Sequence, residues 1–220
     1  MKPTLDDLSD AVIAAFPTLS EAEQFGSLAV YRLLAERRPV TAQQISGASG
    51  VAHEAVREML AKWHGVQRNE EGAVTAFWGL TLAETKHRFH VGGRTLHTWC
   101  AWDTLFLPPL LGTTASVESK CPVTGNRIAL RIGPAGIESS EPEGAVLSFV
   151  TPRESEVQRS LIESFCCHVH FFASPEAGEE WTAQRSGTFL LSLDDAWKIG
   201  IRKNAAQYAV ALMAGVAAAK

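Results

Sequence analysis

The sequence lacks the features that mark nucleic-acid-binding and membrane proteins. It has 220 residues, and neither half carries an excess of basic side chains: residues 1–84 hold seven Lys and Arg against eleven Asp and Glu, and residues 85–220 hold thirteen of each. Contacts to phosphate need clustered Lys and Arg. The longest apolar stretch, residues 205–219, is interrupted by Gln207 and is too short to span a bilayer. We therefore expect neither a nucleic acid nor a membrane as a partner.

The sequence also lacks the features of a secretory leader and of a disulfide framework. A leader needs a basic start and an uninterrupted apolar stretch, whereas the first 17 residues carry Asp6, Asp7 and Asp10. We therefore expect a cytoplasmic protein. In a reducing cytosol, the four cysteines at positions 100, 121, 166 and 167 are more typical of metal-binding or catalytic thiols than of disulfides.

The first third of the chain predicts helices followed by a hairpin. Ser20 and Thr41, followed three residues later by Glu23 and Gln44, fit the capping box that starts a helix. A third helix is expected at about residues 52–63. Two strand-like stretches, 65–68 and 74–82, flank a polar turn. Three helices and a hairpin predict a winged-helix-like domain at residues 1–84.

The remaining residues, 85–220, alternate short β-rich stretches with helical ones. Strands are expected at residues 88–91, 114–118, 128–132, 146–150 and 166–172, and helices at 99–107, 153–162, 176–184 and 193–216. Pro108 and Pro109 are expected to end the first of these helices, because proline lacks a backbone N–H and clashes with the preceding turn. The fold class is therefore predicted to be α+β, with short antiparallel strands in the second domain.

Two segments could carry chemistry, and the first is Trp-Cys-Ala-Trp-Asp-Thr at residues 99–104. On a helix that begins near Trp99, Cys100 and Asp103 would share a face in the first turn. The helix dipole would then lower the pKa of the thiol, and the carboxylate could take its proton and later return it. A buried cysteine beside an Asp that merely favours the helix end would give the same pattern.

The second segment is Cys-Cys-His-Val-His-Phe-Phe at residues 166–172. On a regular strand, Cys166, His168 and His170 would share one face and Cys167 would point to the other. A metal site on that face is a competing idea, but ligands spaced about 6–7 Å per step are too far apart for one ion. We therefore expect His168 and His170 to be hydrogen-bonded core residues. Cys121, in a turn with no second cysteine nearby, is expected to be structural.

Together these segments resemble the two signature segments of the organomercurial (alkylmercury) lyases. The similarity extends to residues 31–39, 78–82 and the segment around Cys121, and covers roughly residues 30–174. In that family two cysteines and one aspartate are catalytic, and the matching positions are Cys100, Cys166 and Asp103. The resemblance implies a catalytic domain at residues 85–220 in which these three residues hold the mercury of substrate and product. It implies no cofactor, external low-molecular-weight thiols for release, and mercuric reductase as an acceptor of Hg(II).

These residue types suit carbon–mercury cleavage. Thiolates are soft ligands that bind soft mercury better than oxygen or nitrogen does, and two of them make the bound carbon more carbanion-like. Either Cys100 or Cys166 would attack first and give its proton to Asp103; the second thiolate then binds, and Asp103 protonates the carbon. Burial would raise the pKa of Asp103 far enough for this role. Trp99 and Trp102 would form an apolar substrate-binding pocket for the organic group.

Two other functions have some support in the sequence. A metal-responsive winged-helix transcription regulator would need a positive recognition helix, but Arg57 and Lys62 at residues 52–63 are balanced by Glu54 and Glu58. A non-catalytic thiol/His metal-binding protein would bind metal at the second segment and release no hydrocarbon.

Overall fold

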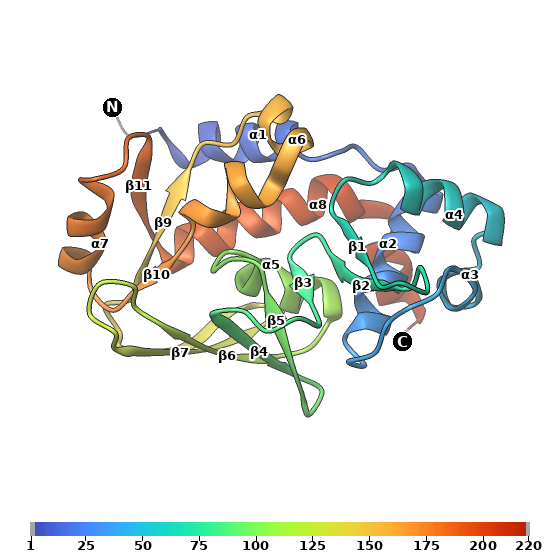
Figure 1. Ribbon diagram of the computed structural model, residues 1–220, viewed down its shortest axis with the longest axis horizontal. Coiled ribbons are helices and arrows are strands. Elements are labelled where there is room, and N and C mark those ends of the chain that lie inside the picture. Colours follow the sequence, from blue (N-terminus) through green and yellow to red (C-terminus); the bar gives the residue numbers. More distant parts are fainter. Residues whose placement is uncertain (1–2, 219–220) are drawn as a thin grey trace.

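The computed structural model describes residues 3–218 and begins with four helices (Figure 1). They are α1 (Leu5–Ala15), α2 (Glu21–Leu34), α3 (Ala42–Ser49) and α4 (His53–Lys62). The predicted capping boxes are confirmed, because the side chains of Ser20 and Thr41 accept hydrogen bonds from the third residue of α2 and of α3. The first helix was not expected, although Thr4 caps it in the same way.

Eight antiparallel strands form one sheet in the order β1-β2-β3-β5-β4-β6-β7-β8. Their bounds are β1 (Val66–Arg68), β2 (Val74–Phe77), β3 (Leu80–Thr81), β4 (His87–Val91), β5 (Arg94–Thr98), β6 (Ala115–Lys120), β7 (Arg127–Gly133) and β8 (Gly136–Glu141). The sheet continues across residue 84, since Leu80 of β3 pairs with Thr98 of β5. A mixed α+β fold with antiparallel strands is therefore confirmed. The winged-helix description and the division into domains at residues 84 and 85 stay predictions.

A second antiparallel sheet has the order β10-β9-β11. It comprises β9 (Val146–Val150), β10 (Phe171–Phe172) and β11 (Thr188–Ser192), and the remaining helices are α5 (Asp103–Leu111), α6 (Glu154–Ser164), α7 (Pro175–Thr182) and α8 (Leu193–Ala218). Strands β5, β8 and β11 were not predicted. Among residues 3–218, no helix combines the length and apolar character needed to cross a bilayer.

The long helix α8 runs through the centre of the molecule, with α1 and α6 on one side and α5 on the other (Figure 1). Its buried residues recur at three- and four-residue spacing, as expected for one face of a helix. It also holds α5 by polar contacts: the Trp102 ring Nε1 donates to the Ala196 carbonyl at 2.9 Å, and Asn204 Nδ2 donates to the Phe106 carbonyl at 2.8 Å. The position of α5 therefore depends on α8.

Two predicted elements near the cysteines are wrong. The helix expected at residues 99–107 begins only at Asp103, and it continues through Pro108 and Pro109 to Leu111. Each proline removes one hydrogen bond, but nearly all of α5 is buried, and packing keeps it helical until Gly112 caps it at φ 67°. The strand expected at residues 166–172 is a short 3-10 helix at Cys166–His168, followed by the two-residue strand β10.

The turn between β2 and β3 brings the backbone against α5. Trp78 and Gly79 both have positive φ, 32° and 102°. The Trp78 carbonyl accepts a hydrogen bond from the Tyr31 hydroxyl at 3.0 Å, and the Gly79 carbonyl accepts one from the Trp99 amide at 2.9 Å. A Cβ added to Gly79 would lie 2.5 Å from the carboxyl carbon of Asp103. Only glycine combines this φ with this close approach.

We predict that Gly79→Ala displaces the Asp103 carboxyl and lowers the hydrocarbon release expected from the sequence resemblance by about tenfold or more. Gly72→Ala is the matched control, because Gly72 has φ 79° and nothing within 4 Å of the added Cβ. Both variants should lose about 1 kcal/mol of unfolding free energy from backbone strain, and Gly79→Ala should lose more because its Cβ overlaps the Asp103 carboxyl. Hydrocarbon release and denaturation curves are measured for both variants. Equal activities would contradict the claim that a Cβ at position 79 displaces the Asp103 carboxyl.

Candidate active site

Two thiols and one carboxyl meet inside the protein. The ligand atoms of Cys100, Asp103 and Cys166 all lie within 4.8 Å of one another. Their exposed fractions are 0%, 5% and 3%, so the group is almost closed to solvent. Within residues 3–218 this is the group of His, Cys, Asp and Glu side chains whose spacing could hold a metal ion. The three residues predicted from the two sequence segments therefore lie together.

Cys100 and Asp103 are joined by a local hydrogen bond. Cys100 follows β5 and precedes α5, and its backbone N–H donates to Asp103 Oδ2 at 2.7 Å. The Thr98 hydroxyl donates to the Cys100 carbonyl at 2.9 Å, which fixes the other end of the same peptide segment. Asp103 is the first residue of α5, where a carboxylate is favoured by the free N–H groups of the first turn.

Cys166 comes from a distant segment that β9 holds in place. Ser148 of β9 donates its hydroxyl to the His168 carbonyl at 2.7 Å and accepts the His170 amide at 3.0 Å. The Ala101 amide donates to the Val169 carbonyl at 3.3 Å, which ties this segment to the one that carries Cys100. The 3-10 turn places Cys166 in the group, although the predicted strand register is wrong.

The adjacent cysteine, Cys167, faces solvent. Its side chain is exposed, and its thiol donates to the Glu163 carbonyl at 2.9 Å. The two neighbouring cysteines therefore point in different directions, as expected, but the cause is the 3-10 turn rather than strand alternation.

Burial controls the protonation of the group. It raises the pKa of Asp103 to about 7, against the opposing effects of the hydrogen bonds from Cys100 and the charge of Lys203. Burial also raises the pKa of the Cys100 thiol well above its usual range, so the expected lowering by a helix dipole is wrong. The hydrogen bond from Cys100 is the largest single effect on Cys166 and favours its thiolate, but burial together with the nearby charges of Asp103 and Cys167 outweighs it, so the pKa of Cys166 is raised as well. At neutral pH both cysteines are therefore thiols, and the pKa of Asp103 is close to the ambient pH.

Lys203 on α8 was missed by the sequence analysis. Its side chain is fully buried, and none of the described residues gives Nζ a hydrogen-bond partner. The Nζ atom lies 4.0 Å from the centre of the Phe106 ring and 5.2 Å from that of Phe16. Burial lowers the pKa of Lys203 to about 7, and the nearby charge of Asp103 opposes this shift. Helical periodicity was the available signal, since Lys203 follows the buried Ile199 by four residues.

The other candidate residues are distributed around the group. Trp102 is fully buried among aromatic rings and Trp99 is half-buried, and their role in holding an organic group stays a prediction. His168 and His170 are half-buried rather than core residues, and neither belongs to the three-residue group among residues 3–218. Cys121 is buried in the turn after β6, outside the group.

Comparisons with known proteins agree on one family. A family model described as alkylmercury lyase matches residues 80–203. An alkylmercury lyase of Staphylococcus epidermidis is 40% identical over 169 residues, covering 77% of this chain and 76% of the relative. Another from Streptomyces lividans is 41% identical over 169 residues, covering 77% of each chain.

A solved structure supports the same fold. The crystal structure of the mercury-bound form of MerB2 has a TM-score of 0.72 to this protein at 22% sequence identity, covering 94% of this chain and all of the other. Since the family model spans more than half of the 220 residues and the relatives match over three quarters of their length, the chain belongs to the alkylmercury lyase family.

Proposed function

We propose that this protein is an organomercurial lyase in which Cys100, Cys166 and Asp103 cleave the carbon–mercury bond by protonolysis. The supporting observation is the burial of two thiols and one carboxyl within 4.8 Å. Two soft sulfur ligands match mercury, and the carboxyl supplies an acid for carbon. The family and its named members support a carbon–mercury lyase activity. The roles of the individual residues are our proposal.

The first steps transfer mercury to the two cysteines. A substrate R–Hg–SR′ exchanges its thiolate with one cysteine, so that a Cys–S–Hg–R adduct forms and R′SH leaves with the cysteine proton. The sequence alone suggested that the first cysteine gives its proton to Asp103, but here the leaving thiolate takes that proton. The second cysteine passes its proton to the Asp103 carboxylate, and its sulfur binds the same mercury. Asp103 can accept this proton near neutral pH because burial raises its pKa to about 7.

Cleavage follows from the position of the protonated carboxyl. Asp103 returns the proton to carbon, the carbon–mercury bond breaks, and R–H leaves while Hg(II) stays on the two sulfurs. The reactants are two cysteine thiols and R–Hg–SR′. The products are a bis-thiolate Hg(II) complex, R–H and R′SH. No redox change occurs, and we propose no cofactor. Low-molecular-weight thiols then remove Hg(II) and pass it on, with mercuric reductase as a proposed acceptor in the cytoplasm.

The function is tested by adding phenylmercury with excess thiol and measuring benzene. Release of more benzene than protein is expected from an enzyme. Stoichiometric mercury binding without benzene would instead indicate a non-catalytic metal-binding protein.

We predict that Cys166→Ser abolishes turnover while Cys167→Ser retains it. Cys166 belongs to the buried group, whereas the Cys167 thiol is exposed and donates to a backbone carbonyl. Benzene release by each variant measures the difference, and thermal unfolding checks that both fold. An inactive Cys167→Ser beside an active Cys166→Ser would reverse the assignment.

Asp103→Asn should separate mercury capture from bond cleavage. The amide keeps the size and polarity of the side chain but cannot transfer the proton, so benzene release should fall by about 10²–10⁴-fold. Two cysteines remain, and mass spectrometry should detect the uncleaved phenylmercury adduct. Release near the wild-type rate would mean that another group or water protonates the carbon.

Lys203→Met should shift the pH dependence of turnover. Removing the buried cation removes an effect that lowers the pKa of Asp103, so this pKa rises. The carboxylate that must accept a thiol proton then forms only at higher pH. At pH 7 the rate should fall about two- to fivefold, as expected when a pKa of about 7 rises by half to one unit, and it should recover toward pH 9. Lys198→Met, on the exposed side of α8, is the control and should keep the wild-type pH dependence. An unshifted pH–rate profile for Lys203→Met would refute the effect of the Lys203 charge on the pKa of Asp103.

A further inference from the structure

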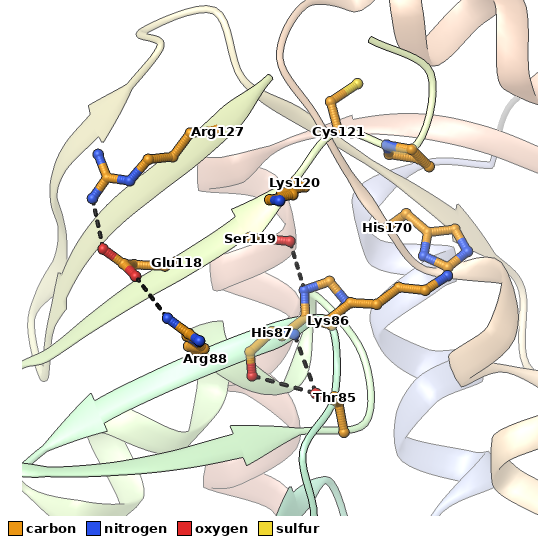
Figure 2. Close-up of a pocket in the computed structure, with 11 residues that line it drawn as sticks. Thr85, Lys86, His87, Arg88, Glu118, Ser119, Lys120, Cys121, Arg127 and His170 are labelled. Atoms are coloured by element: carbon orange, nitrogen blue, oxygen red, sulfur yellow. Dashed lines mark hydrogen bonds and ion pairs between the residues drawn. The ribbon is translucent and has the colours of Figure 1, made fainter. Parts of the chain in front are cut away.

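A cleft of about 650 Å³ lies beside the segments that carry the cysteines. The start of β4, the end of β6 with the following turn, and His170 form its walls (Figure 2). Its volume is within the range of about 300–1,000 Å³ that is common for small-molecule sites. None of the proposed catalytic residues lines it.

The cleft is basic in a chain whose net charge is −4. Lys86, Arg88, Lys120 and Arg127 line it together with one carboxylate, Glu118. Figure 2 shows Glu118 between the two arginines, with Arg127 at 2.7 Å and Arg88 at 3.9 Å. Neither lysine forms an ion pair with a carboxylate in the part of the chain that the structure describes. Arg127 also lies 3.7 Å from Glu141, so the two arginines face two carboxylates and the two lysines leave an excess of two positive charges.

Two neutral histidines complete the polar lining. Burial lowers the pKa of His87 to about 3, with a further contribution from His170, and burial also lowers the pKa of His170. His87 Nδ1 lies 2.9 Å from the Ser119 hydroxyl. In Figure 2 the Lys86 side chain extends toward the His170 ring. The cleft thus offers free cations beside uncharged hydrogen-bonding groups, which suits an anionic ligand with further polar parts.

Hydrogen bonds link the cleft to both cysteine segments. His170 Nε2 donates to the Cys167 carbonyl at 2.9 Å, one residue after Cys166. On the other wall, the Thr85 hydroxyl donates to the Thr98 carbonyl at 2.6 Å, two residues before Cys100. A ligand in the cleft would therefore contact Thr85 and His170, which hydrogen-bond to the backbone close to Cys100 and Cys166.

We propose that this cleft binds the carboxylates of an anionic small-molecule thiol that takes Hg(II) from Cys100 and Cys166. Lys86 and Lys120 would hold the carboxylates. In the exchange, each incoming thiol forms one S–Hg bond, one Cys–S–Hg bond breaks, and the proton of the thiol passes to the released cysteine. The oxidation state of mercury is unchanged. This inference rests on the proposed lyase function, which supplies the bound Hg(II).

The first experiment measures binding without mercury. S-methylglutathione, which carries two carboxylates and no free thiol, is titrated into the protein and followed by NMR. We expect saturable binding that NaCl weakens and that the double variant Lys86→Gln/Lys120→Gln weakens about fivefold or more. Lys198→Gln, an exposed lysine on α8, should bind as the wild type does. Absence of binding, or equal binding by the double variant, overturns the proposal.

The second experiment uses turnover with two thiols. For the double variant, the KM for glutathione in benzene release should rise about fivefold, whereas the KM for uncharged 2-mercaptoethanol should not change. Equal effects on both thiols, or no effect on either, overturn the proposal while the lyase function stands. If the wild type releases no benzene with either thiol, the proposed function fails, and the binding experiment still decides whether the cleft takes the anion.

Discussion

The hydrogen bond from the Cys100 amide to the Asp103 carboxylate is the interaction on which the site depends. It fixes a carboxyl beside a thiol in a region that excludes water, and the backbone on both sides is held by other elements. Gly79 leaves room for the carboxyl, and α8 fixes the helix that Asp103 begins. The third member, Cys166, is brought to this pair by the contact between Ala101 and Val169.

Burying two thiols and a carboxyl together disfavours their charged forms, and the protein offsets only part of this electrostatic cost. Desolvation disfavours the charged form of each group, and no full ion pair offsets it among the described residues. Lys203 lies close enough to moderate the shift at Asp103 but forms no hydrogen bond with it. The site therefore holds two thiols and one carboxyl near its midpoint of titration.

Sequence patterns predicted local features well. They failed where contacts between distant segments determine the local conformation or the burial of a residue. The resemblance of two motifs to a known family identified Cys100, Asp103 and Cys166, which the structure brings together, and the capping boxes followed from short-range rules. The 3-10 turn at Cys166 could not be foreseen, since a hydroxyl from β9 stabilises it. Lys203 was missed because an isolated lysine in a helix is usually solvated, and only the packing of α8 shows that it is buried.

The pairing of β3 with β5 makes the first third of the chain inseparable from the rest. A fragment that began after residue 84 would keep strands in the order β5-β4-β6-β7-β8, with β5 as an uncovered edge. Such an edge presents unpaired N–H and C=O groups that recruit strands from other chains. The exposed edge would lie directly before Cys100, so the same cut would favour aggregation and open the buried group of Cys100, Asp103 and Cys166 to water.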